Sequence, residues 1–290
     1  MTPFAYARPR TLAQAVALME EHGPDVRLLS GGTDLLIALR NHAVEPRVVI
    51  DLKRVEELQP TIDEDGDKLS ITASVVMTDI VEDARIQTYF PALAEAAVVV
   101  GSVQIRNRAT LAGNICNCSP AADTAPPLLV YHATVVVAGR NERRRIPIDD
   151  FIRGPGETAL EPGELVTAIE LPIPKGPYGA AFTRLARRRG TDLASITLCC
   201  GVDPQGVTRL SYGSVGPRPF LVVDESGVLA DRTAPEDRRA AVLDRMFVDA
   251  SPAPAFFYRA GPEYRLAMLR VLGRRALEVA IDRLDGMGIR

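Results

Sequence analysis

Two short glycine-containing segments have the residue types of an anion-binding loop. The first is Ser30-Gly31-Gly32-Thr33-Asp34, and the second is Thr110-Leu111-Ala112-Gly113-Asn114. A glycine turn between a strand and a helix exposes backbone N–H groups at the positive end of the helix, where a phosphate is favoured. A single loop of this kind is weak evidence, because a tight turn that needs a positive φ is the simpler explanation. Two of them, about eighty residues apart, suit the two phosphates of a dinucleotide.

Other catalytic motifs are missing from the sequence. Neither loop has the G-x-G-x-x-G spacing with an acidic residue about twenty positions later, and neither is followed by the Lys-Ser/Thr of a P-loop. There is no serine nucleophile elbow, and the three histidines, His22, His42 and His132, are scattered. If the chain is an enzyme, an organic cofactor must therefore supply the chemistry.

Each glycine loop must be held by regular elements. Residues 26–30 read as a strand that leads through the first loop into a helix with Thr33 and Asp34 in its first turn. Residues 47–52 form a second strand. A helix over residues 91–100 ends at Gly101, and residues 101–123, which contain the second loop, read as ordered irregular backbone.

The remainder of the chain predicts an α+β fold with two domains. A Pro/Gly-rich segment over residues 172–179 is the expected boundary between them. The other expected strands are 69–76, 134–138, 165–171, 195–202 and 207–215, and the other expected helices begin at residues 78, 126, 235 and 260.

Length and composition limit the function. The chain has 290 residues, 47% hydrophobic and 24% charged, so it is long enough for about two globular domains. The net charge of -3 disfavours a nucleic-acid partner. No apolar run predicts membrane insertion or a signal peptide. Cys116, Cys118, Cys199 and Cys200 are too close in pairs for a secreted disulfide framework, which favours the cytoplasm.

The sequence resembles the FAD-binding medium subunit of the molybdenum hydroxylases, the family of xanthine dehydrogenase, carbon monoxide dehydrogenase and 4-hydroxybenzoyl-CoA reductase. The resemblance follows the whole chain in order. The motifs that carry it are Ser30-Gly31-Gly32-Thr33-Asp34, Gln104-Ile105-Arg106-Asn107 continuing to Ile115, Ser119-Pro120-Ala121-Ala122-Asp123, and Phe151-Ile152-Arg153-Gly154-Pro155-Gly156. It implies a two-lobed FAD-binding domain of the vanillyl-alcohol oxidase (PCMH) type over residues 1–175, with lobes of about 1–55 and 56–175. A smaller α+β domain with a short antiparallel sheet and helices follows over residues 179–290.

The same resemblance assigns the residues that contact FAD. The family's acid falls on Asp123, whose alternative role is to cap the helix that starts near Thr124. Arg184 stands where some members have a lysine, and Val100 where the animal enzymes have a phenylalanine. The assigned residues are Leu28, Leu29, Ser30, Gly31, Gly32, Thr33, Asp34, Leu35, Val100, Thr110, Leu111, Ala112, Gly113, Asn114, Asp123, Val166 and Arg184.

No metal site is expected in this chain. The reductase type of the family carries an extra [4Fe-4S] cluster on an insertion after the Gly-Asn step, and this sequence lacks that insertion. A cluster needs four thiolates, and Cys199 and Cys200, adjacent on a strand, would face opposite sides. The arginine runs 143–145 and 187–189 read as solvated faces, although the second lies near Arg184 and could serve the FAD site or a subunit contact.

The function that the resemblance implies is electron transfer. A large subunit would hold molybdopterin and the substrate, a small subunit two [2Fe-2S] clusters, and this chain FAD, which would pass electrons to an acceptor such as NAD+. No residue of this chain would be a general acid or base. Two alternatives stay open: a stand-alone FAD-dependent oxidase, and a FAD-free scaffold subunit.

Overall fold

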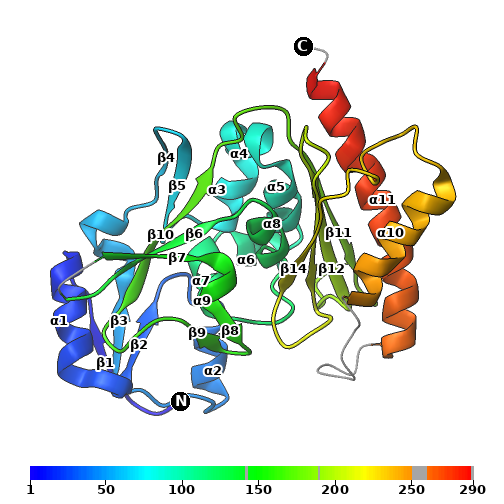
Figure 1. Ribbon diagram of the computed structural model, residues 1–290. Helices are drawn as coiled ribbons and strands as arrows, with labels where there is room; N and C mark the ends of the chain where they lie inside the picture. Colours follow the sequence, from blue (N-terminus) through cyan, green and yellow to red (C-terminus); the bar gives the residue numbers. More distant parts are fainter. Residues whose placement is uncertain (141–142, 189, 250–259, 289–290) are drawn as a thin grey trace.

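The structure, a computed structural model, describes residues 1–140, 143–188, 190–249 and 260–288 (Figure 1). The helices are α1 Leu12–His22, α2 Leu35–Arg40, α3 Met77–Glu82, α4 Ala84–Tyr89, α5 Pro91–Val98, α6 Val103–Arg106, α7 Leu111–Cys116, α8 Ala125–Val130, α9 Ile148–Phe151, α10 Glu236–Asp249 and α11 Pro262–Gly288. The strands are β1 Ala5–Ala7, β2 Val26–Leu29, β3 Val48–Asp51, β4 Ile62–Asp65, β5 Lys68–Thr72, β6 Thr134–Ala138, β7 Arg143–Pro147, β8 Ile152–Gly154, β9 Glu157–Thr158, β10 Leu165–Pro172, β11 Gly179–Leu185, β12 Ile196–Val202, β13 Thr208–Gly213 and β14 Phe220–Asp224.

The N-terminal lobe is built on a parallel sheet with the strand order β1-β3-β2. All four residues of the central strand β3 are buried, which is typical of a parallel sheet covered on both faces. Leu29 at the end of β2 pairs with Asp51 at the end of β3. The first glycine loop therefore leaves from the carboxyl edge of the sheet, where open α/β units bind ligands. Helix α2 begins at Leu35, so Thr33 and Asp34 precede it rather than form its first turn.

The second lobe is an antiparallel sheet with the order β4-β5-β10-β6-β7. Helices α3 to α8 lie between this sheet and the sheet of the C-terminal region (Figure 1). One apolar core includes Ile50 of the first sheet, Leu69 and Val135 of the second, and Phe90 between the helices. The two lobes are thus joined by a common core. Their predicted limits, and the predicted division of the chain between residues 175 and 179, remain predictions; that division falls in the turn between β10 and β11.

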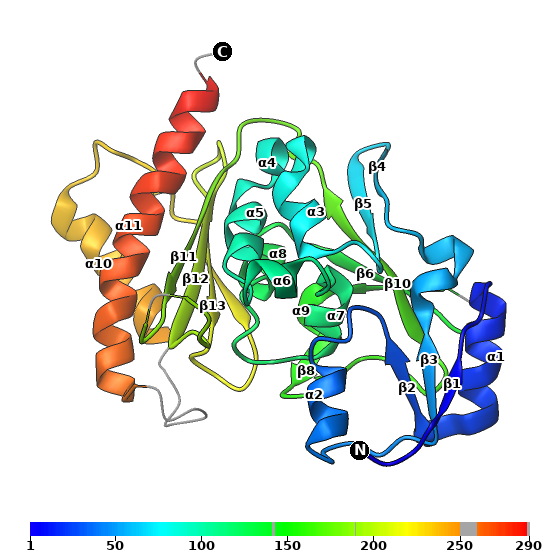
Figure 2. The same cartoon turned by 180° about the vertical axis from the view of Figure 1, so that it is seen from behind.

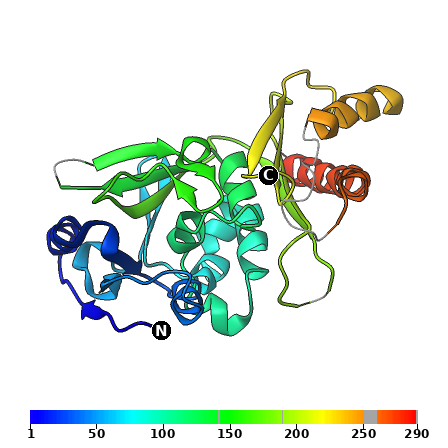
Figure 3. The same ribbon diagram turned by 90° about the horizontal axis from the view of Figure 1, so that it is seen from below.

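The C-terminal region is an antiparallel sheet, β11-β12-β13-β14, with α10 and α11 on its outer face (Figure 3). Its inner face packs against the helices of the second lobe. Cys199 belongs to the core of the two lobes, whereas Cys200 belongs to a separate core formed with α10 and α11. The expectation that these two cysteines face opposite sides of a strand is confirmed, and so is the predicted α+β class.

The prediction of irregular backbone over residues 101–123 was wrong in part, because α6 and α7 lie within it. Both helices have side-chain caps: Ser102 accepts a hydrogen bond from the Ile105 N–H at 3.3 Å, and Thr110 accepts one from the Gly113 N–H at 3.0 Å. Serine and threonine are favoured N-caps, so the sequence did contain the signal. The two helices span only four and six residues, which is too short for a helical periodicity to show in the sequence.

The first arginine run is a strand rather than only a solvated face. On β7, Arg144 donates to both oxygens of Glu164 at 2.7 and 2.6 Å. Arg145 donates to Glu170 on β10 at 3.1 Å. Both carboxylates have their pKa held below the ordinary value by hydrogen bonds from these arginines, against the opposing effect of burial. The run therefore ties the edge strand β7 to Glu164 and to β10, across the intervening strand β6.

Candidate cofactor-binding site

The two glycine loops contact each other directly. In Figure 2 the loop between β2 and α2 reaches the start of α7. The Oγ atoms of Ser30 and Thr110 lie 3.2 Å apart. A Cβ added to Gly31 would lie 2.1 Å from the carbonyl oxygen of Arg108, so only glycine allows this approach. The sequence predicted the two loops, and the structure brings them together.

The first loop presents a row of backbone donors. Within the part of the chain that the structure describes, the N–H groups of residues 31 to 35 donate to no protein acceptor. The first N–H to close a helical bond is that of Leu36, to the Gly32 carbonyl at 3.1 Å. Gly32 has a φ of +80°, which turns the loop. Successive free N–H groups of this kind can bind an anion such as a pyrophosphate.

The second loop is fixed by hydrogen bonds from its own side chains. Thr110 caps α7, and a Cβ on Gly113 would lie 2.8 Å from the Thr110 hydroxyl oxygen. Thr124 donates to the Asn114 side-chain oxygen at 2.6 Å, which ties α7 to α8. Leu111 and Ala112 are buried in the core, so these two can meet a cofactor only through their backbone.

Asp123 and Arg184 form an ion pair between the second lobe and the C-terminal sheet. The Arg184 Nε donates to Asp123 Oδ1 at 2.9 Å, and the same guanidinium donates to the Asp192 carbonyl. Asp123 is 9% exposed, and burial raises the pKa of its carboxyl to about 6 although Arg184 opposes the rise. Asp123 does not cap α8, whose N-cap residue is Thr124. The pair offers one acceptor group and one cation to a polar ligand.

The other assigned residues lie around these features. Val166 on β10 is 5% exposed and lies beside a register shift in the pairing with β6. Val100, just after α5, is partly buried. Leu28, Leu29, Thr33 and Leu35 are partly buried, and Asp34 is exposed. Contact of any of these residues with FAD stays a prediction.

Some residues that shape the site were not predicted. Arg108 supplies the carbonyl that Gly31 packs against, and Thr124 anchors Asn114. Thr191 donates to the Gly101 carbonyl at 3.2 Å, which joins the C-terminal region to the end of α5. Arg108 lies inside the recognised motif, but a role through the main chain leaves no signal in residue type. The other two depend on contacts between distant segments.

In the second arginine run, residues 187–189, the first two residues contact the short segment that follows the run. Arg187 lies 3.4 Å from the carboxylate of Asp192, and Arg188 donates to the Thr191 carbonyl at 3.3 Å. Arg189 lies outside the described residues. The predicted role of this run at the FAD site or at a subunit contact stays a prediction.

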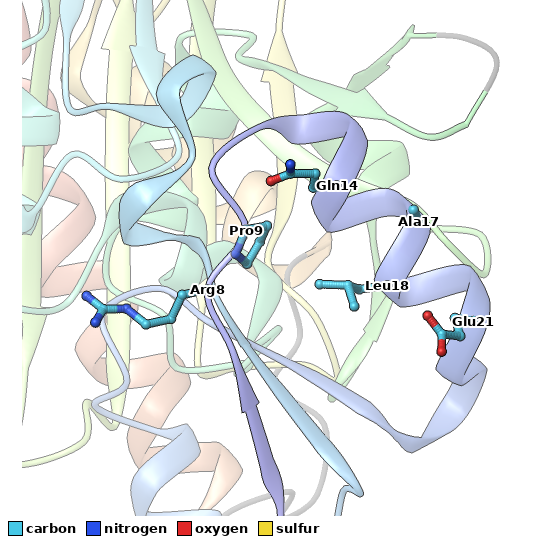
Figure 4. Close-up of a pocket in the computed structure, with 6 residues that line it drawn as sticks. All are labelled: Arg8, Pro9, Gln14, Ala17, Leu18 and Glu21. Atoms are coloured by element: carbon cyan, nitrogen blue, oxygen red, sulfur yellow. The ribbon is translucent and has the colours of Figure 1, made fainter.

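A pocket of about 380 Å³ lies between the N-terminal segment and α1 (Figure 4). Its lining residues are Arg8, Pro9, Gln14, Ala17, Leu18 and Glu21. None of them is assigned to FAD, and Arg8 turns its guanidinium away from the helix (Figure 4). Over the described ranges, no group of three His, Cys, Asp or Glu side chains is placed to hold a metal ion. No helix in those ranges has the length and apolar character needed to cross a membrane.

Comparison with known proteins identifies the class. Residues 2–174 match the family described as the FAD binding domain in molybdopterin dehydrogenase. The match covers more than half of the chain, and the chain therefore belongs to this family. The resemblance drawn from the motifs is confirmed: this is a flavin subunit of the molybdenum hydroxylase type, an oxidoreductase.

Individual relatives extend the match to nearly the whole chain. The xanthine dehydrogenase FAD-binding subunit of Escherichia coli O157:H7 is 32% identical over 288 residues, covering 97% of each chain. The carbon monoxide dehydrogenase medium chain of Hydrogenophaga pseudoflava is 30% identical over 281 residues, covering 96% of each. A solved structure of carbon monoxide dehydrogenase from that organism superimposes with a TM-score of 0.86, covering 98% of this chain and 99% of the other at 30% identity.

Proposed function

We propose that this chain binds FAD between its two glycine loops and the Asp123–Arg184 pair, and that it passes electrons from iron–sulfur clusters to an external acceptor. When bound, FAD supplies the reversible uptake and release of electrons. The observation that carries the proposal is the contact of the two loops around a row of free N–H groups, from residue 31 to residue 35.

The chain's own part is to bind and orient the cofactor. The N–H groups of the first loop hold the pyrophosphate, and the Thr110 hydroxyl, which caps the second loop, lies 3.2 Å from the Ser30 hydroxyl of the first. Asp123 accepts hydrogen bonds from hydroxyl or ring N–H groups, while Arg184 keeps its carboxylate ionised near neutral pH. Because these groups are preformed, little ordering is needed when FAD binds.

The proposal includes partner subunits, because the relatives are themselves named as FAD-binding subunits and medium chains. A large molybdopterin subunit oxidises the substrate, and a small subunit with two [2Fe-2S] clusters relays the electrons. NAD+ is the acceptor in this proposal, and the complex works in the cytoplasm, in keeping with four free cysteine thiols.

The test is purification of the chain with its partners, followed by flavin analysis. We expect an equimolar amount of FAD that is released on denaturation, together with co-purifying molybdenum and iron–sulfur subunits. Flavin that stays on the denatured chain, without partners, would favour the stand-alone oxidase. A chain that shows no flavin absorption even after incubation with FAD would refute the proposal and favour a scaffold role.

A further inference from the structure

The edge strand β11 carries Arg184, and its free edge is closed by two charged side chains. In the sheet order β11-β12-β13-β14, β11 has a ladder partner on one side only. Along β11, Ala180, Phe182 and Arg184 follow the period of two, so their backbone groups point alike. At the open edge, the Phe182 N–H donates to Glu95 Oε2 at 2.9 Å. The Ala180 carbonyl accepts from Arg283 Nη1.

The two side chains are also bound to each other across three elements. Arg283 on α11 donates through Nη2 to Glu95 Oε1 on α5, 188 residues away in sequence. Glu95 therefore uses one carboxylate oxygen for the strand and the other for the helix behind it. Helix α11 lies directly against β11, as shown by Gly179: a Cβ added there would be 1.8 Å from the Ala280 carbonyl oxygen. A donor and an acceptor of β11 are thus satisfied as a neighbouring strand would satisfy them.

The turn after α5 holds the far end of the segment that follows Arg184. Beyond α5, the Gly101 carbonyl accepts from the Thr191 hydroxyl at 3.2 Å. Arg184 lies between these two attachments, one pleat or ~6.7 Å beyond Phe182. Its guanidinium is bound to Asp123 and to the Asp192 carbonyl. A shift of β11 along α5 would move Arg184 relative to Asp123.

We infer that Glu95, together with Arg283, is a positioning residue for the FAD site. It fixes the position of β11 along α5, and so the position of Arg184 relative to Asp123. This inference rests on the proposed function. Glu95 itself touches no part of the assigned site in the described residues; it acts through the backbone of the edge strand.

The test is a double-mutant cycle on FAD affinity in the full chain, read from the quenching of flavin fluorescence. In Glu95→Gln only one side-chain oxygen remains, so an amide N–H must face either the Phe182 N–H or Arg283. We expect the Kd for FAD to rise about fivefold, since one charge-assisted bond is lost. In an Arg184→Ala background, which alone raises the Kd about tenfold or more, the same change should have less than a 1.5-fold effect.

Two further variants separate positioning from a general loss of stability. Arg283→Gln weakens the same contacts from the side of α11. We expect its effect on the Kd for FAD to depend on Arg184 in the same way, even if Glu95→Gln folds poorly. Asp282→Asn is the control: it breaks the exposed pair with Arg232 on the same helix, one residue away, and should leave FAD affinity unchanged. A long-wavelength shift of the flavin absorption band in the Glu95 variant only when Arg184 is present would support the same conclusion.

The outcomes distinguish this inference from the proposed function. Equal effects of Glu95→Gln with and without Arg184 would overturn the positioning role while FAD binding stands. A native chain that binds no FAD, or one whose affinity is unchanged by Arg184→Ala, would overturn both this inference and the site assignment on which it rests.

Discussion

Replacement of Gly31 by alanine tests how closely the two glycine loops must approach. A Cβ at this position would lie 2.1 Å from the Arg108 carbonyl oxygen and 3.0 Å from the Ala109 Cα. Both neighbours are backbone atoms, which cannot rotate away, so the loops must separate by roughly 1 Å. Overpacking of this kind costs ~1–3 kcal/mol. The free chain can relieve the strain by opening, but a chain that holds FAD between both loops cannot.

The strain therefore appears mainly as lost affinity. The Kd for FAD should rise roughly 5- to 150-fold, the equivalent of 1–3 kcal/mol, with a smaller drop in the melting temperature of the FAD-free chain. Fluorescence titration with FAD and thermal unfolding measure the two effects. Gly176→Ala is the matched control, because no atom lies within 4 Å of its added Cβ. An affinity within twofold of the native chain for Gly31→Ala would refute the idea that the loops clasp FAD together.

Two further substitutions and one labelling experiment have definite expected results. Gly179→Ala places a Cβ 1.8 Å from the Ala280 carbonyl oxygen, so α11 must move from β11 and chemical denaturation should show ~1–3 kcal/mol less stability. Burial raises the pKa of Asp123 from 3.8 to about 6, so the folded state binds the proton of this carboxyl more tightly than the unfolded state does. That contribution of about 3 kcal/mol is present at low pH and lost as the pH rises through 6; Asp123→Asn should abolish this slope in unfolding free energy. Burial also raises the pKa of the Cys199 and Cys200 thiols, so iodoacetamide at pH 8 should label them only after denaturation, which mass spectrometry can check.

The glycine loops could be predicted from sequence because their chemistry is local. A strand, paired glycines and a helix signal lie within about fifteen residues, and the free N–H groups follow from that order. The strands over residues 134–138 and 165–172 were predictable for the same reason, since their β-branched residues favour extended backbone. The contact of Gly31 with the Arg108 carbonyl was not predictable, because a close approach between distant backbones leaves no mark other than the glycine itself.

Strand β11 is an element that could not be predicted from the sequence. Its seven residues include Gly179, Ala180 and Ala181, which have low strand propensity, and the sequence did not mark it as a strand. Tertiary contacts make it one: pairing with β12 on one side, and Glu95 with Arg283 on the other. The resemblance placed Arg184 near the cofactor, but its pairing with Asp123 depends on this strand.

The family match covers residues 2–174, whereas Arg184 lies on β11 in the C-terminal region. Both glycine loops and Asp123 lie inside that range, and the cation bound to Asp123 lies outside it. Asp123 is 9% exposed, and burial raises the pKa of its carboxyl, an effect that Arg184 opposes. The charge of a buried acid in the matched range is thus compensated by a cation from the C-terminal region. The contacts that hold β11 against α5 therefore bear on the position of Arg184, although none of their side chains reaches the Asp123–Arg184 pair.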